Sequence, residues 1–85
     1  SLHNQVTQQL LNSAAGLRPA AALPLLERIL ELDPLHEAAI LQLLRLLVDL
    51  GRPVAARQRL TAFRKLLFEE TGLEPRRELL EVIAE

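Results

Sequence analysis

Arg18-Pro19-Ala20-Ala21-Ala22 returns 34 residues later as Arg52-Pro53-Val54-Ala55-Ala56, and this repetition decides the fold. Apolar positions follow the same spacing, in the pairs Val6 and Ile40, Leu10 and Leu44, Leu26 and Leu60, and Ile29 and Phe63. A period of 34 residues is the length of one pair of antiparallel helices in proteins built from stacked helical hairpins. We therefore expect an all-α stack of hairpins. Such stacks usually present binding surfaces and seldom catalyse reactions.

Proline and glycine residues divide the chain into about five expected helices, the arrangement of a tetratricopeptide-like stack. We expect Asp33 to cap the third helix and Pro24 to weaken or delay the start of the second. The third helix is apolar around most of its circumference, so its neighbours must cover it on several sides. The fourth helix has an inward face of Ala56, Leu60, Phe63 and Leu67. The five helices span residues 2–15, 19–32, 34–50, 53–71 and 75–84.

The composition is that of one small domain, residues 1–85, with a net charge of −1 and no cysteine. This charge argues against strong phosphate binding by the domain as a whole, and the lack of cysteine excludes disulfides and thiolate metal sites. No apolar run is long enough to cross a membrane, and we expect no membrane partner. The chain starts at Ser1 without a methionine, so we expect it to be a fragment of a longer protein.

The charges are unevenly distributed along the chain. Residues 51–68 contain five bases and no acid, whereas residues 69–85 contain six acids and two arginines. A basic helix followed by an acidic one either pairs internally across the hairpin or reserves a basic face for an outside partner. We favour internal pairing.

Catalytic and metal-binding residues do not gather in any recognisable pattern. His3 and His36 are the only histidines, and neither has an obvious serine or cysteine partner. We expect His36 to be a solvated residue in the first turn of the third helix. Glu27 and Glu31 are four residues apart, but Arg28 lies between them and no further ligand converges. We therefore expect no enzyme activity, no metal and no cofactor.

Gln42, Arg45 and Asp49 share one narrow polar stripe on the third helix. In superhelical stacks the first helix of each hairpin lines the concave surface, where peptides or helices bind. The stripe is therefore a candidate partner site. The alternative is a solvent-facing stripe that serves solubility only, in which Arg45 and Asp49 pair with each other.

Phe68 is the second candidate, because it lies with Arg57 and Arg64 on the face of the fourth helix opposite its apolar residues. Exposed aromatic residues beside arginine have the composition of a binding hot spot. The alternative is that the last helix turns back after Gly72 and covers Phe68, making it part of the core.

Residues 25–79 resemble the bacterial transcriptional activator domain, a tetratricopeptide-like module of regulators of the Streptomyces antibiotic regulatory protein type. The resemblance rests on Leu-Glu-Arg-Ile-Leu-Glu-Leu-Asp-Pro-Leu-His-Glu-Ala at 26–38 and Leu-Gly-Arg at 50–52. Its most specific part is the ending at 64–75, Arg-Lys-Leu-Leu-Phe-Glu-Glu-Thr-Gly-Leu-Glu-Pro. The chain departs from the family where Leu60 replaces a common tyrosine and Phe68 replaces a common charged residue.

This resemblance implies a protein–protein interaction or oligomerisation module of a cytoplasmic transcriptional regulator. Its partner would be a second copy in a homodimer, an adjacent DNA-binding domain or the transcription machinery, and DNA would be contacted only through a domain that these 85 residues lack. Three alternatives remain open. The first is accessory DNA-backbone binding by Arg52, Arg57, Arg59, Arg64 and Lys65. The second is a generic tetratricopeptide peptide-binding scaffold, and the third is a spacer or dimeriser with no ligand in its groove.

Overall fold

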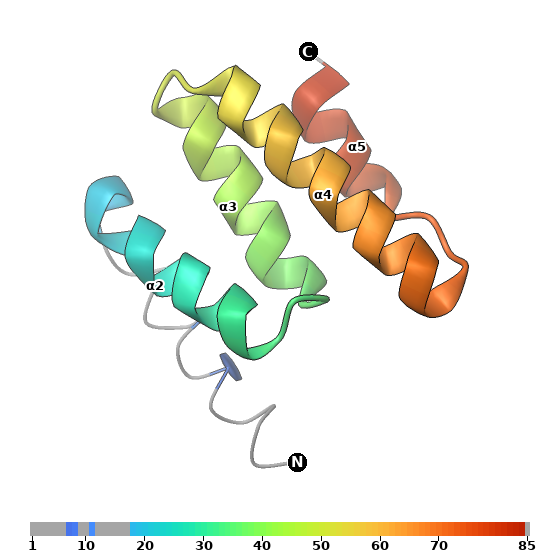
Figure 1. Cartoon of the computed structure of the whole chain (residues 1–85). Helices are drawn as coiled ribbons and strands as arrows, with labels where there is room; N and C mark the ends of the chain where they lie inside the picture. The colour runs from blue at the N-terminus through green and yellow to red at the C-terminus, as the bar shows by residue number, and fades with distance from the viewer. Residues whose placement is uncertain (1–6, 9–10, 12–17, 85) are drawn as a thin grey trace.

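The computed structural model describes residues 7–8, 11 and 18–84, and the regular structure of these residues is entirely helical (Figure 1). The helices are α2 (Pro19–Leu32), α3 (Glu37–Asp49), α4 (Pro53–Thr71) and α5 (Arg77–Ala84). The all-α prediction is confirmed. Residues 7, 8 and 11 are also helical, with Thr7 and Leu11 buried, but the rest of the expected first helix lies outside the described residues.

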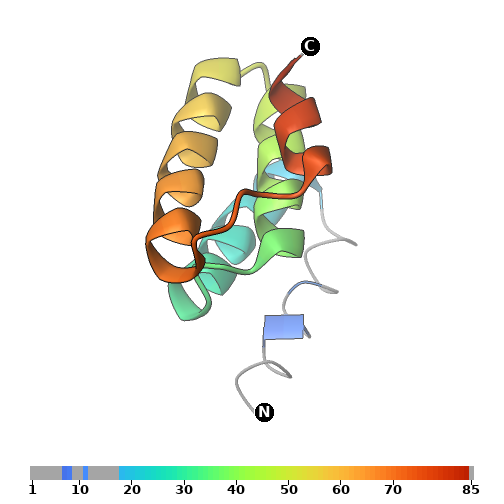
Figure 2. The ribbon, with the colours of Figure 1, turned by 90° about the vertical axis from the view of Figure 1, so that its right-hand side faces the viewer.

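Helix α3 is the centre of the domain, as its nearly continuous apolar surface predicts. It packs against α2, α4 and α5, and α4 also packs against α5. Consecutive helices run antiparallel, so α2–α3 and α3–α4 are hairpins and α5 returns along α4 (Figure 1). Seen from the side, α4 forms one side of the molecule and α3 and α5 form the other (Figure 2). Among the described residues, no helix is long and apolar enough to span a membrane.

The residues that share the 34-residue spacing occupy equivalent places in the core. Leu26 and Leu60 are 1% and 7% exposed, and Ile29 and Phe63 are 0% and 4% exposed. The small residues Ala22 and Ala56 are also buried. The repeat seen in the sequence is therefore a repeat of packing, in which α2 and α4 present the same pattern to their neighbours. Val6 and Leu10 lie outside the described residues.

Helix α2 begins at Pro19, so the expected delay at Pro24 is wrong. The Arg18 carbonyl accepts hydrogen bonds from the N–H groups of Ala21 and Ala22, at 3.0 and 2.9 Å, which closes the first turn before Pro24 is reached. Pro24 removes one later N–H donor. Because Pro24 and Ala20 are both exposed, water can bond to the Ala20 carbonyl that this donor would otherwise occupy.

Helix α3 begins at Glu37 and is capped by His36, so the expected Asp33 cap and the expected solvated role of His36 are both wrong. Asp33 precedes Pro34, which disfavours the helical region for Asp33, and its φ of −144° and ψ of 85° lie outside that region. Asp33 instead ends α2, with its N–H donating to the Ile29 carbonyl at 2.8 Å. His36 then accepts the Ala39 N–H on its Nδ1 at 3.1 Å. Pro34 therefore belongs to a turn between two helices and not to a first helical turn.

Two glycines end α3 and α4, as the sequence predicts. Gly51 and Gly72 have φ of +74° and +73°, the left-handed conformation that glycine adopts without steric cost. After α3, Gly51 donates to the Val48 carbonyl and Arg52 to the Leu47 carbonyl, the hydrogen-bond pair of a Schellman motif. After α4, a single bond joins the Gly72 N–H to the Phe68 carbonyl at 2.8 Å.

Candidate interaction surfaces

An exposed stripe of five residues runs along α4. Its members follow one another at intervals of three and four, which places them on one side of a helix, and all five are exposed. Phe68 is 59% exposed and Val54 is 61% exposed. We call this surface the α4 stripe, and it consists of Val54, Arg57, Thr61, Arg64 and Phe68.

Helix α5 does not cover Phe68, so the core alternative for this residue is wrong. After Gly72 the chain leads into α5, whose Leu79 is 1% exposed, and α5 packs against α3 and α4. The residue of α4 that is buried next to Phe68 is Leu67, at 5% exposure. Phe68 is one step further around the helix and faces solvent. Of the predicted site residues, Arg57, Arg64 and Phe68 therefore do lie together on one accessible surface.

Internal ion pairs account for part of the basic charge of α4. Arg64 donates to Oε2 of Glu74 from Nε at 3.3 Å and from Nη2 at 3.1 Å, and Arg59 lies 3.2 Å from Glu27 of α2. The Arg64–Glu74 pair joins the basic helix to the acidic segment that follows it, as favoured from the sequence, whereas Arg59 pairs with α2, and no ion pair joins α4 to α5 among the described residues. Within the part of the chain that the structure describes, Arg57 forms no ion pair, nor do Arg52 and Lys65.

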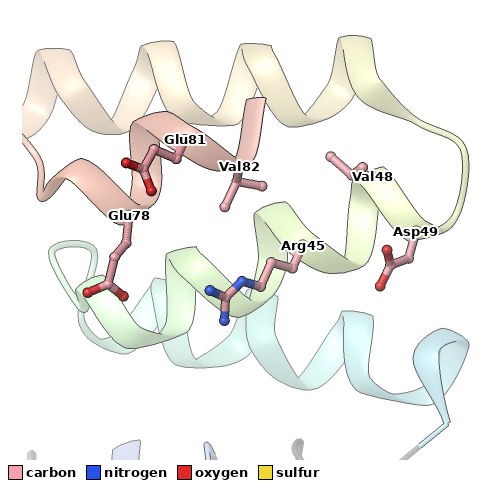
Figure 3. A pocket seen from close by; sticks show the side chains of 6 residues that line it. All are labelled: Arg45, Val48, Asp49, Glu78, Glu81 and Val82. Carbon is pink, nitrogen blue, oxygen red and sulfur yellow. The ribbon is translucent and has the colours of Figure 1, made fainter. Parts of the chain in front are cut away.

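A groove of about 380 Å³ lies between α3 and α5 (Figure 3). Helix α3 contributes Arg45, Val48 and Asp49, and α5 contributes Glu78, Glu81 and Val82. One base and three acids leave the groove with a formal charge of −2, and the two valines provide apolar surface between them. We call this surface the α3–α5 groove.

The predicted stripe on α3 is only partly a groove surface. Arg45 and Asp49 line the groove, whereas Gln42 is partly buried and does not. Arg45 and Asp49 do not pair with each other, because the Arg45 side chain extends along α3 away from Asp49 (Figure 3). Sequence reasoning missed Glu78 and Glu81 as neighbours of Arg45. The sequence does show that Glu78 and Glu81 share an acidic face of the last helix. It does not show which helix this face lies against.

The described residues contain no group of three or more His, Asp or Glu side chains that could hold a metal ion. Glu27 and Glu31, four residues apart, each bind an arginine: Glu27 binds Arg59, and Glu31 binds Arg28 at 2.9 Å. His36 is occupied by its capping bond, and His3 lies outside the described residues.

Comparison with known proteins assigns the chain to one family. The family model described as the bacterial transcriptional activator domain matches residues 2–85. A search of the curated proteins and a search of the solved structures each find no match. The match covers nearly the whole chain, including all four described helices and both candidate surfaces.

Proposed function

The chain belongs to the bacterial transcriptional activator domain family, and from this we propose that it is a protein–protein interaction module of a bacterial transcriptional regulator, without catalysis of its own. In this proposal its partner is a second copy, an adjacent DNA-binding domain or the transcription machinery. We further propose that the module works in the cytoplasm, where a bacterial transcriptional regulator meets DNA.

The observation that carries this proposal is the exposure of Phe68 on the α4 stripe. Phe68 is 59% exposed, so most of its apolar surface stays in water. It therefore stabilises the fold much less than a buried aromatic side chain would. Arg64 lies one turn before Phe68 and is held there by Glu74. Arg57 lies on the same side of α4, two turns before Arg64. Aromatic residues and arginines dominate the energetics of protein interfaces. The α3–α5 groove is the second candidate surface for the same function.

DNA-backbone binding by α4 is the alternative, and the structure offers it less support. Arg59 and Arg64 are already paired with acids, which leaves Arg52, Arg57 and Lys65 to contact phosphate. Three phosphate contacts correspond to a slope of roughly −2.7 in log affinity against log salt. Binding to duplex DNA with a slope near this value would favour the DNA alternative, whereas no measurable DNA binding at low salt would exclude it.

The test is Phe68→Glu, compared with Leu73→Glu as a matched control. Leu73 is similarly exposed, at 63%, but lies in the turn after α4 and outside the α4 stripe. We expect Phe68→Glu to abolish self-association, measured by size-exclusion chromatography with light scattering at low and moderate salt, and to leave helicity and melting temperature nearly unchanged. The control should behave as wild type in both measurements.

A large drop in melting temperature for Phe68→Glu would mean that Phe68 stabilises the fold, and the site would be wrong. A folded wild type that remains monomeric would instead direct the search to the other two partners. The same variant pair would then be tested for binding to the adjacent DNA-binding domain and to RNA polymerase.

A further inference from the structure

The α4 stripe and the α3–α5 groove carry opposite charges on one molecule. The stripe presents Arg57 and Arg64, with Phe68 and Val54 as its apolar members. The groove presents three carboxylates against one arginine, and Val48 at its edge is 39% exposed. Both surfaces therefore combine exposed apolar residues with charges mainly of one sign, basic on the stripe and acidic in the groove. The two surfaces are complementary in charge.

The two surfaces cannot satisfy each other within one chain. The groove is lined by α3 and α5 and by no residue of α4. Helix α4 contacts α3 through its buried residues, so its stripe is directed to solvent and not into the groove. The opposite charges can meet only between two molecules.

We propose that the α4 stripe of one copy docks into the α3–α5 groove of a second copy, so that the domain associates head to tail. This inference rests on the proposed function and deepens it by naming the partner and the two surfaces. Arg57 of one copy, which forms no ion pair among the described residues of its own chain, faces the carboxylates of Asp49, Glu78 and Glu81 in the other. Phe68 packs against Val48 and Val82, the two valines that line the groove.

A head-to-tail contact suits these surfaces better than a symmetric one. If two α4 stripes met face to face, the unpaired Arg57 of one copy would lie near the arginines of the other, and no unpaired acid of the stripe would meet it. If two grooves met, they would bring three carboxylates from each copy together. Like charges brought together across an interface are unfavourable, whereas the mixed contact joins base to acid. Because a head-to-tail pair would still have one free stripe on one copy and one free groove on the other, association would continue beyond two chains.

The experiment uses one variant for each surface. Phe68→Ser removes the aromatic side chain of the stripe and leaves the groove intact. Serine is used here because glutamate at this position could pair with an introduced lysine. Glu81→Lys reverses one charge in the groove and leaves the stripe intact. The control for the first variant is Leu73→Ser, and the control for the second is Glu31→Lys on the exposed surface of α2. Circular dichroism and thermal melting confirm that all four variants are folded.

Light scattering of wild type should give an average mass that rises with concentration beyond twice the 9.5 kDa of one chain, and that falls as salt increases. Each surface variant alone should need at least about tenfold more protein to associate, as expected for loss of a hot-spot residue or a charge pair. An equimolar mixture of the two should form a one-to-one complex and grow no further, because only one intact stripe and one intact groove remain. The two controls should behave as wild type.

Three results would overturn the head-to-tail contact: a wild type that stays monomeric at all concentrations, a wild type whose mass stops at two chains, or a mixture of the variants that fails to associate. None of these overturns the proposed function, since a symmetric dimer or a different partner would still be compatible with it. The proposed function is refuted by a different result: Phe68→Glu unfolds the domain, or it leaves binding to every candidate partner unchanged.

Discussion

Replacement of Gly51 by alanine should destabilise the domain by about 1 kcal/mol, and the whole effect should come from the backbone. Gly51 has φ of +74°, and no atom lies within 4 Å of the position that a Cβ would occupy. No steric clash therefore adds to the cost. An L-residue in the left-handed region costs roughly 1–2 kcal/mol, while alanine restricts the unfolded chain and returns about 0.4–1 kcal/mol. The difference between these two effects is the expected loss.

Gly72 provides the matched comparison, because its φ is +73° and a Cβ there would also meet nothing within 4 Å. Gly72→Ala should therefore cost about the same as Gly51→Ala, even though the two glycines make different hydrogen-bond motifs. Each loss would be measured by urea and thermal unfolding followed by circular dichroism, where 1 kcal/mol lowers the melting temperature of a domain of this size by roughly 4–8 °C. Gly51→Asn should cost less than Gly51→Ala, since asparagine tolerates this region better. A loss above about 3 kcal/mol at either site, or none at both, would refute the purely conformational account.

Two further predictions concern the stability of the helices. His36→Ala should cost about 1 kcal/mol, because it removes the side chain that accepts the Ala39 N–H at the start of α3, and His36→Asn should restore most of that loss in urea unfolding. Phe63→Ala should cost roughly 3–5 kcal/mol, since it empties space around a side chain that is only 4% exposed. Unfolding curves that show no more than about 1 kcal/mol for Phe63→Ala would mean that the core between α3 and α4 is not packed as described.

The sequence predicts the ends of a helix well where the residue at that end is compatible with only one position, either inside the helix or in the turn. Helices α2 and α4 have the predicted bounds, because proline opens each of them and a turn residue closes each. The starts of α3 and α5 were predicted too early, at Pro34 and Pro75. Proline is compatible both with a first helical turn and with the turn before it, so its presence does not decide between the two. His36 was missed because histidine is not among the residues that usually cap helices.

The candidate surfaces were predictable only as far as helix periodicity reaches. Periodicity places Phe68 to the side of the inward face of α4, one residue beyond Leu67, but whether α5 covers it depends on the path of the chain after Gly72. In the same way, the spacing of Arg45 and Asp49 predicts a shared face on α3. It says nothing of the helix across from it, and so Glu78 and Glu81 were not predicted. Which helices pack against each other depends on the conformations of the turns and on side-chain packing. The pattern of residues within one helix does not determine either.

In the proposed interaction, the exposed charges on these surfaces act on recognition more than on the stability of the fold. Arg64 and Glu74 are 49% and 62% exposed in their side chains, and exposed pairs of this kind contribute little to folding. Arg57 has no acidic partner among the described residues and so contributes no ion pair to the fold. Charges across an interface mainly set orientation and association rate, whereas buried aromatic anchors supply most of the affinity. It follows that changes at Arg57 should act on the salt dependence and the association rate of the complex. Changes at Phe68 should act on its dissociation.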